Sequence, residues 1–316
     1  MSSSNPSRSG NPAKRAVAER AAAVPAGAAG WIAGARIRTL TLAIAPVAAG
    51  TGAAIVIAGP GVFHWVRALL CLVVALGLQI GVNYANDYSD GIRGTDAYRV
   101  GPARLTGSGA VSPKRVLVVA LVFFGIAAVA GLALVVLTQQ WWLLAVGAVA
   151  LVAAWFYTGG RRPYGYAGLG ELAVFVFFGL VATAGTTFVQ VLYVSLESWL
   201  AGVAIGLVAC AVLMVNNLRD RDQDRLAGKR TLSVLIGRTA SKVVYCVFLL
   251  APFVIVALIA LVYPLGWLTL FGLLLALPAA LITCTAKTSA ELILALKLTS
   301  FVGLIIGVGL GAAFAF

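Results

Sequence analysis

The chain has 316 residues, of which 61% are hydrophobic and only 10% are charged. Soluble globular domains have about 25% charged residues, so this composition excludes that class and indicates an integral membrane protein. The formal net charge of +13 would also suit a nucleic-acid-binding protein. The basic residues, however, are spread over several short loops without a recognisable binding module, so we expect no nucleic-acid partner.

Residues 1–30 are rich in Ser, Pro, Ala, Gly and basic side chains. They are too polar to pack and lack the apolar core of a secretory signal. We therefore expect a disordered tail over 1–30 and a single transmembrane domain over 31–316.

Apolar segments fill most of this domain. Crossing a hydrocarbon core of about 30 Å requires about 20 residues. Nine segments approach this length, at about 39–58, 66–86, 115–137, 141–157, 168–190, 198–217, 243–263, 265–284 and 298–316. They show no strand alternation, and a membrane-spanning backbone must satisfy its own hydrogen bonds, so we predict an all-α polytopic protein with about nine transmembrane helices.

The basic residues orient the chain. If the nine segments cross in turn, every lysine and arginine except Arg67 falls on one side. By the positive-inside rule this side is cytoplasmic. The N-terminus and the polar loops after the second and sixth segments are therefore expected in the cytoplasm.

Cysteine and histidine carry no recognisable site. The four cysteines stand singly inside apolar segments without a CxxC pair, and we expect small buried hydrophobic side chains rather than ligands or disulfides. His64 lies in a short connection beside Trp65, where a structural or interfacial role is expected.

All six aspartates lie in two short stretches, 83–96 and 216–224, each at the end of an apolar segment. Asn86 and Asp90 are four residues apart, as are Asp220 and Asp224, so on a continuing helix each set shares one face. The stretches end the second and the sixth segments, which indicates a weak repeat of two four-helix halves plus a ninth helix. Opposed faces would line one central cavity.

Clustered carboxylates near a membrane require a cationic partner, because an aspartate at the bilayer centre costs about 2.5–3.5 kcal/mol on insertion scales. Asp and Asn oxygens suit Mg²⁺ or Mn²⁺, and basic loops nearby suit phosphate. Together they predict a diphosphate site. The alternative is that the acids pair with neighbouring arginines. We favour this for Asp222 beside Arg221, and favour the metal for Asp90, Asp220 and Asp224.

Two motifs carry a resemblance to a known family. The first is Asn86-Asp87-x-x-Asp90 with Asp96 beyond it, and the second is Asp220-x-x-x-Asp224 followed by Gly228-Lys229-Arg230-Thr231-Leu232. As a pair they resemble the motifs of the UbiA superfamily of intramembrane aromatic prenyltransferases. The resemblance covers the chain after the tail, and with segments 35–40, 94–106 and 157–171 it is strongest to the branch that prenylates 1,4-dihydroxy-2-naphthoate.

One position departs from that resemblance. Many relatives place the last acid of the first motif where this chain has Gly94, and Asp96 comes two residues later. The assignment of Asp96 as a ligand is therefore less direct than that of Asp90.

The resemblance implies a UbiA-type bundle in a bacterial cytoplasmic membrane and an Mg²⁺-dependent reaction. A polyprenyl diphosphate would alkylate 1,4-dihydroxy-2-naphthoate, with loss of CO₂, to give demethylmenaquinol for menaquinone biosynthesis; 4-hydroxybenzoate is the alternative acceptor. The apolar bundle would keep water from the developing allylic cation, and the prenyl tail would leave between helices into the bilayer.

It also implies roles for particular residues. The expected metal ligands are Asn86, Asp87, Asp90, Asp96, Asp220 and Asp224. Asp90, Asp220, Asp224 and Tyr157 are the expected catalytic residues, and Arg93, Lys229 and Arg161 the expected diphosphate-binding residues. Tyr157 would face the allylic cation or the aromatic substrate, or else be an interfacial tyrosine. Arg38, with Arg36, would pair with the naphthoate carboxylate, or else anchor the membrane interface.

Two rival functions fit less well. The pair Asp90-Gly91 also suits a CDP-alcohol phosphotransferase, but the continuation Ile92-Arg93 departs from that motif and the second acidic set is over a hundred residues away. A cation-coupled transporter would bind ions near mid-bilayer at broken helices. Here the acids fall at segment ends beside basic loops, which favours phosphate chemistry.

Overall fold

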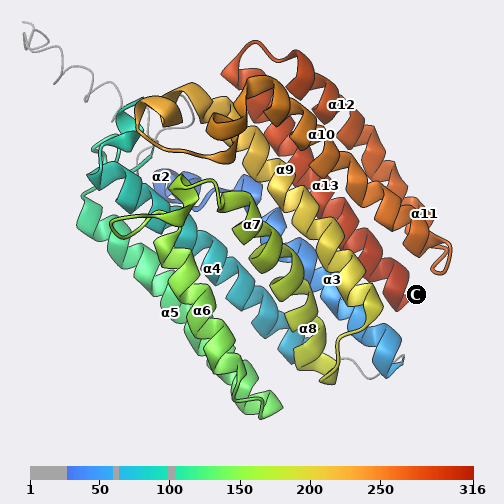
Figure 1. Cartoon of the computed structure of the whole chain (residues 1–316). Helices are drawn as coiled ribbons and strands as arrows, with labels where there is room; N and C mark the ends of the chain where they lie inside the picture. Colours follow the sequence, from blue (N-terminus) through green and yellow to red (C-terminus); the bar gives the residue numbers. More distant parts are fainter. Residues whose placement is uncertain (1–26, 60–63, 99–103) are drawn as a thin grey trace, which may run out of the picture.

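A computed structural model describes residues 27–59, 64–98 and 104–316, and the only regular elements within these ranges are helices (Figure 1). The tail predicted over 1–30 lies largely outside them. Eight helical segments are long and apolar enough to cross a membrane, and a shorter apolar helix, α6, corresponds to the fourth predicted segment. The prediction of an all-α polytopic protein is confirmed.

The helices follow the chain in a simple order. The continuous helices after the short α2 (Ala28–Ala35) are α3 (Thr41–Ala58), α4 (Trp65–Ile92), α5 (Pro113–Thr138), α6 (Leu143–Phe156), α9 (Leu196–Leu226) and α13 (Ser289–Ala315). The helix α10 (Leu232–Ala260) is kinked at Gly237, whose φ is 84°. Two spans are composite: α7 (Gly170–Val174), a π-helical turn η4 (Phe175–Val181) and α8 (Ala182–Val191) form one, and α11 (Gly266–Thr269), η5 (Leu270–Gly272) and α12 (Leu273–Thr285) form the other.

The helices that carry the acidic stretches extend beyond the predicted apolar segments. The predicted segments end near 86 and 217, whereas α4 continues to Ile92 and α9 to Leu226. Polar residues end an apolar segment but not a helix when their side chains face a shared interior. Both acidic sets therefore stay on helical backbone and keep their four-residue faces.

Close packing of small residues joins α3 to α13. A side chain at Gly52 would place its Cβ 2.2 Å from the carbonyl oxygen of Gly311, and one at Gly307 would lie 2.4 Å from the Cα of Ala45. Because lipid is as apolar as the helices, membrane helices associate through such close backbone approach rather than through the hydrophobic effect.

The π-helical turn has a similar cause. A side chain at Gly179, inside η4, would lie 2.6 Å from the carbonyl oxygen of Gly202 on α9. The widened turn and the missing side chain let the α7–α8 span pass close to α9.

The two sides of the bundle differ in how they are filled. The largest buried core lies among α3, α9, α10, α12 and α13 and includes Ile205, Tyr245, Leu249 and Ile306. A smaller core joins α4 to α5 around Tyr84 and Phe124. Figure 1 shows α9 between the α7–α8 span and α13. A cavity lies on the other side of α9 from the largest core and is bounded by α3, α4, α5, α6, the α7–α8 span and α9.

Candidate active site

The cavity has a volume of about 920 Å³ and changes character along its length. Away from the acidic residues, its walls are mainly apolar side chains of α3, α4, α5, α6 and the α7–α8 span. Its polar end lies where α4 and α9 finish and is lined by Asn86, Asp87, Asp90, Arg104, Asn216, Asn217, Arg219, Asp220, Asp224 and Lys229. The structure thus brings the two acidic stretches, more than a hundred residues apart in sequence, to one cavity.

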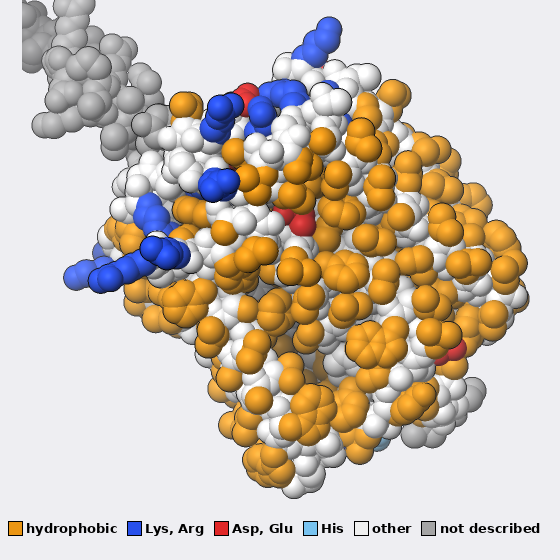
Figure 2. All heavy atoms as spheres, in the orientation of Figure 1, with side chains coloured by type: hydrophobic (Ala, Val, Ile, Leu, Met, Phe, Trp, Pro, Cys, Tyr) orange, Lys and Arg blue, Asp and Glu red, His pale blue; other side chains and the backbone are white. Residues whose placement is uncertain are grey.

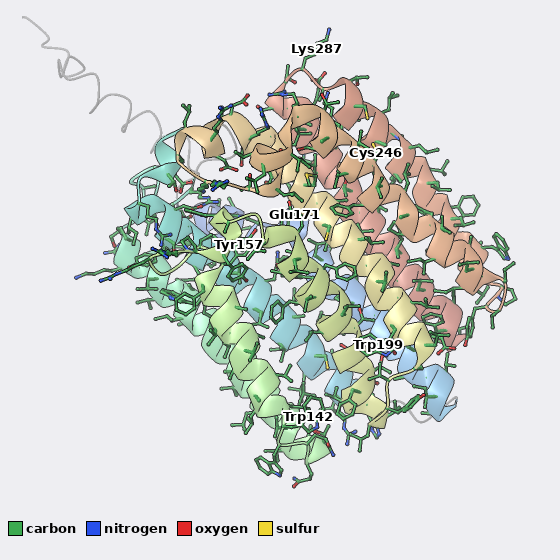
Figure 3. The ribbon with its side chains drawn as sticks, in the orientation of Figure 1. Trp142, Tyr157, Glu171, Trp199, Cys246 and Lys287 are labelled. Atoms are coloured by element: carbon green, nitrogen blue, oxygen red, sulfur yellow. The ribbon has the colours of Figure 1, made fainter. Side chains whose placement is uncertain are left out.

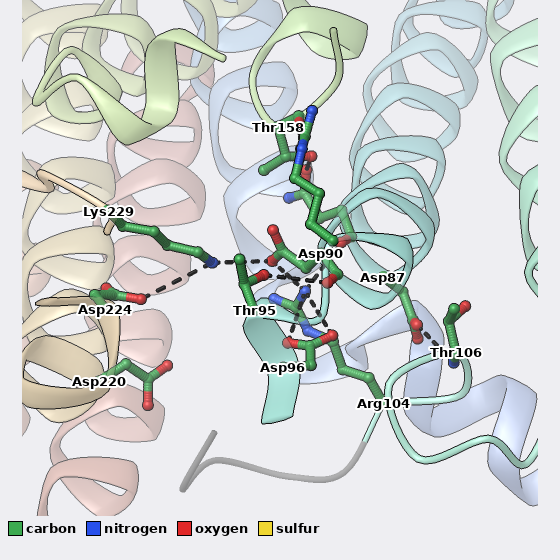
Figure 4. A network of polar contacts seen from close by, with 12 residues as sticks. Asp87, Asp90, Thr95, Asp96, Arg104, Thr106, Thr158, Asp220, Asp224 and Lys229 are labelled. Carbon is green, nitrogen blue, oxygen red and sulfur yellow. Dashed lines mark hydrogen bonds and ion pairs between the residues drawn. The ribbon is translucent and has the colours of Figure 1, made fainter. Parts of the chain in front are cut away.

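Asp90 is the centre of the polar contacts at this end (Figure 4). Its side chain is 2% exposed. One carboxylate oxygen accepts a hydrogen bond from the hydroxyl of Tyr166, and the other contacts the guanidinium of Arg104 and lies 3.3 Å from the ammonium of Lys229. Three parts of the chain therefore converge on one carboxylate at the end of α4.

Lys229 joins the two acidic stretches. Its Nζ lies 3.9 Å from Oδ1 of Asp224 in addition to its contact with Asp90. It also stands 4.7 Å from the ring centroid of Tyr166, a cation–π geometry. The backbone N–H of Arg230 donates to the carbonyl oxygen of Tyr166 at 2.9 Å, so the loop after α9 is fixed against the loop after α6.

The remaining acids of the second stretch have different partners. The guanidinium of Arg219 donates to both carboxylate oxygens of Asp220, at 2.8 and 2.5 Å. Asp222 points away from the cavity and pairs with Arg221 and Arg238, each at 2.9 Å. Asp220 therefore faces the cavity, and Asp222 forms the surface ion pairs that we favoured from the sequence.

The first stretch divides its side chains between the cavity and the following loop. Asn86 lines the cavity, and its Oδ1 accepts a hydrogen bond from the Thr158 hydroxyl at 2.7 Å. Asp87 also borders the cavity, but its carboxylate accepts the backbone N–H groups of Leu105 and Thr106 at 2.9 and 2.8 Å. In this structure Asp87 anchors the loop after α4.

Asp96 lies on a short helix η2 (Thr95–Tyr98) and is buried. Its carboxylate is 3.4 Å from the guanidinium of Arg104. A small pocket beside the main cavity is lined by Asp96 together with Asp220, Asp224 and Lys229. The two-residue displacement from the family position therefore still places this acid beside the second stretch.

The structure separates the predicted phosphate-binding residues. Lys229 lies between the acids, whereas Arg93 and Arg161 are exposed and do not line the cavity. The guanidinium of Arg93 donates to the carbonyl oxygens of Thr158 and Gly160 and so holds the loop after α6. Among the three, only Lys229 lines the cavity and contacts its carboxylates.

The predicted aromatic-substrate residues lie on the cavity wall. Arg36, Arg38 and Tyr157 all line it. The ring of Tyr157 packs edge-on against Tyr164, with centroids 5.5 Å apart. Burial raises the pKa of Tyr164 to about 12, so this neighbouring hydroxyl stays protonated at physiological pH.

Several residues of the site were not predicted from the sequence, among them Arg104, Tyr166, Glu171, Asn217 and Arg219. Burial lowers the pKa of the Arg104 guanidinium, but Asp96, Asp90 and Asp87 raise it and the net shift is upward, so Arg104 remains a cation. Burial, followed by the negative charge of Asp90, raises the pKa of Tyr166. For Glu171 a signal existed, since an acid at the start of an apolar segment is costly unless it has a purpose.

Oxygen donors dominate the polar end of the cavity, and carboxylate and amide oxygens suit a hard cation such as Mg²⁺. Over the described residues, however, no three His, Cys, Asp or Glu side chains already form a metal-binding group. The carboxylates are instead paired with Arg104, Lys229 and Arg219. The donor chemistry fits a divalent ion, and in this structure the same carboxylates contact basic side chains.

The chain resembles known proteins over most of its length. The model of the UbiA prenyltransferase family matches residues 43–291. The chain is 47% identical over 286 residues to a 1,4-dihydroxy-2-naphthoate octaprenyltransferase of Mycobacterium tuberculosis, covering 90% of this chain and 97% of that one. To the protein of the same name in Haemophilus influenzae it is 36% identical over 289 residues, with 88% and 93% covered.

Solved structures share the fold. A UbiA homolog from Aeropyrum pernix K1 superposes with a TM-score of 0.62 at 20% identity, covering 87% of this chain and 96% of that one. A UbiA homolog from Archaeoglobus fulgidus, solved bound to GPP and Mg²⁺, has a TM-score of 0.58 at 12% identity, with 89% and 99% covered.

Proposed function

The chain belongs to the UbiA prenyltransferase family, and we propose that it transfers a polyprenyl group from polyprenyl diphosphate to 1,4-dihydroxy-2-naphthoate in a bacterial cytoplasmic membrane. The naphthoate acceptor is supported by the names of the relatives at 47% and 36% identity. The single observation that carries the chemistry is the meeting of two acidic helix ends at one cavity, joined by Lys229 between Asp90 and Asp224.

The donor is proposed to lie along the cavity. Its diphosphate would occupy the polar end, and its prenyl chain would follow the apolar walls. These walls contact an isoprenoid chain without leaving polar groups unpaired, and they exclude water from the allylic carbon when the C–O bond to diphosphate breaks. The length of chain that is transferred is set by the donor and by how the tail leaves the bundle.

The residues at the polar end would hold a divalent cation and the leaving group. Asp90, Asp220 and Asp224, with Asn86 and Asp96, are the proposed ligands. Mg²⁺, when bound, supplies neutralising charge for the diphosphate. Lys229 is placed to hold a phosphate oxygen directly, since its ammonium already bridges carboxylates of both stretches.

The acceptor is proposed to bind near Tyr157, Arg36 and Arg38. A guanidinium there would pair with the naphthoate carboxylate and orient the ring toward the allylic carbon. The ring carbon that carries the carboxylate would form the new C–C bond, and its bond to CO₂ would break. The products are then demethylmenaquinol, CO₂ and diphosphate.

The test is prenyl transfer by purified protein in detergent or nanodiscs, with farnesyl or a longer prenyl diphosphate and each acceptor in turn. We expect prenylated product with 1,4-dihydroxy-2-naphthoate and Mg²⁺, and none after chelation. Asp90→Asn and Asp224→Asn should each lower turnover about 100-fold or more, whereas Asp222→Asn, outside the cavity, serves as the matched control and should retain activity. Undiminished turnover in the first two variants would refute the site.

The acceptor is decided in the same experiment. Preferential turnover of 4-hydroxybenzoate would keep the site and the reaction class but replace the acceptor. No transfer to either ring, combined with Mg²⁺-dependent loss of the prenyl diphosphate, would indicate a different acceptor for the same donor chemistry.

A further inference from the structure

Arg104 makes the contacts that a bound cation would make to the first acidic stretch. A single nitrogen, Nη1, contacts a carboxylate oxygen of Asp90, lies 3.4 Å from Asp96 and donates to the backbone carbonyl of Asn86 at 3.0 Å. The side chain is 10% exposed. One buried positive group therefore neutralises two of the carboxylates proposed to bind metal.

The rest of the polar end is neutralised in the same way. Lys229 lies between Asp90 and Asp224, and Arg219 pairs with Asp220. Carboxylates that lie so close to one another would repel strongly in a membrane interior if they had no counter-charge. A divalent cation that binds Asp90 or Asp96 must therefore compete with Arg104.

The backbone that follows Arg104 is held in place by contacts that do not involve its guanidinium. The next two residues, Leu105 and Thr106, donate their N–H groups to Asp87, and a side chain at Gly107 would lie 2.5 Å from the Cβ of Asp96. Along the Arg104 side chain, Nε is buried and makes no hydrogen bond to the described residues. A change of rotamer can therefore move the guanidinium without moving the loop.

We propose that Arg104 is a positioning residue that neutralises and holds Asp90 and Asp96 in the metal-free protein and yields these contacts to the divalent cation when it binds. The inference rests on the proposed Mg²⁺ dependence. Arg104 would thus keep the acids buried and aimed at the cavity before loading, at the cost of a weaker apparent affinity for metal.

The two effects of removing Arg104 have opposite signs. Without the guanidinium, the metal-free protein loses a buried counter-charge and becomes less stable. The metal no longer displaces anything, so its apparent affinity rises. A residue that only held the loop in place would lower stability with and without metal alike and leave the affinity unchanged.

The experiment compares wild type, Arg104→Gln and Arg238→Gln, with Mg²⁺ as the only ligand. Arg238 loses the same charge but pairs with Asp222 outside the cavity, so it is the matched control. We measure the Mg²⁺ dissociation constant by calorimetry and the apparent melting temperature with and without Mg²⁺. Arg104→Gln should bind Mg²⁺ about tenfold more tightly and gain more in melting temperature from Mg²⁺ than the other two proteins.

Each result decides between the proposals. Equal or weaker Mg²⁺ binding by Arg104→Gln, with clear binding by wild type, overturns the role of Arg104 and leaves the proposed function intact. Failure of wild type to bind Mg²⁺, with or without diphosphate present, overturns both.

A folding defect would also be informative. If Arg104→Gln is recovered folded only when Mg²⁺ is present during purification, the metal replaces the lost charge and the inference holds. If it fails in both buffers, Arg104→Lys is titrated instead. Lysine lacks the reach to keep all three contacts, so the Arg104→Lys variant should bind Mg²⁺ more tightly than wild type. An unchanged dissociation constant would overturn the inference.

Discussion

Glu171 acts on the site without lining the cavity. Its side chain is 5% exposed, and its Oε1 accepts a hydrogen bond from the side-chain amide of Asn217 at 3.1 Å. Asn217 lines the cavity three residues before Asp220. The hydrogen bond from its NH₂ group to Glu171 therefore fixes the orientation of a side chain that borders the cavity. Figure 3 shows Glu171 close to Tyr157 in the same part of the bundle.

The contact predicts a difference between two substitutions. Glu171→Leu removes the acceptor and leaves the amide of Asn217 unpaired, which costs about 1–3 kcal/mol of stability and should lower kcat/KM for prenyl transfer about tenfold. Glu171→Gln keeps an acceptor oxygen in the same shape and should retain most activity. Melting temperature and kcat/KM of both variants are the measurements. If Gln is as damaging as Leu, the carboxyl group itself is required and the positioning role is wrong.

Residue positions were predictable where spacing on one helix decided them. The four-residue faces of Asn86–Asp90 and Asp220–Asp224 needed only the helix period. Arg93 and Arg161 were predicted to bind diphosphate, but the structure shows that the guanidinium of Arg93 donates to the carbonyl oxygens of Thr158 and Gly160. The contact of Tyr166 with Asp90 joins the end of α4 to the loop after α6, 76 residues further along the chain, and no local pattern could indicate it.

Arg67, the one basic residue that departs from the positive-inside pattern, is held by backbone carbonyl oxygens. Its guanidinium donates to Leu137 O at 3.1 Å, Val189 O at 2.9 Å and Gln190 O at 3.3 Å. These carbonyls belong to the last turns of α5 and α8, where a helix has no partners of its own for them. The sequence marked Arg67 as an exception but not as a cap for two helix ends.

We therefore expect Arg67→Ala to destabilise the protein by about 1–3 kcal/mol, because three carbonyls, two of them part-buried, lose a charged donor. Arg67→Lys keeps the charge but cannot reach all three carbonyls. Its melting temperature should therefore fall between those of wild type and Arg67→Ala. Thermal unfolding followed by size-exclusion fluorescence measures this order. Equal stability of the Ala and Lys variants would contradict this order. It would show that a positive charge alone contributes nothing at this end of the bundle.

Small residues between α3 and α13 give a second test at the level of elements. Gly307→Leu would push a side chain into the backbone at Ala45, an overpacking that typically costs about 1–3 kcal/mol. Gly125→Leu on α5 is the matched control, since a side chain there meets nothing within 4 Å. The first variant should lose folded protein and melt at a lower temperature, and the second should behave as wild type. Similar melting of the two would mean that the α3–α13 approach contributes little.

Helix boundaries were less predictable than helix existence. Hydropathy located every span, but it ended α4 and α9 within their acidic stretches, before the helices themselves end. It also could not show the π-helical turn η4, because that turn depends on the close approach of Gly179 to α9. The sequence therefore predicts features that depend on a single helix, such as the position of a span. It does not predict features that depend on contact between two helices, such as the π-helical turn.

The charges of the whole molecule predict which end of the cavity faces the cytoplasm. Lys and Arg side chains gather at the end of the bundle where α9 finishes, while the sides are hydrophobic (Figure 2). Trp142 and Trp199 lie toward the opposite end from Lys287 (Figure 3), and the one described cation at that end, Arg67, is bound to carbonyl oxygens. By the positive-inside rule, we therefore propose that the acidic end faces the cytoplasm.

Single cysteines test this orientation. In a variant whose four native cysteines are replaced by alanine, Lys287→Cys and Gln139→Cys place one thiol at each end, and both positions are exposed. In intact cells a membrane-impermeant maleimide should label Gln139→Cys and leave Lys287→Cys unlabelled until the cells are opened. Inside-out vesicles should reverse the pattern. The reverse result in intact cells would place Asp90 and Asp224 on the outer side, away from a cytoplasmic supply of anionic donor and Mg²⁺, and the proposed reaction could not proceed in this orientation.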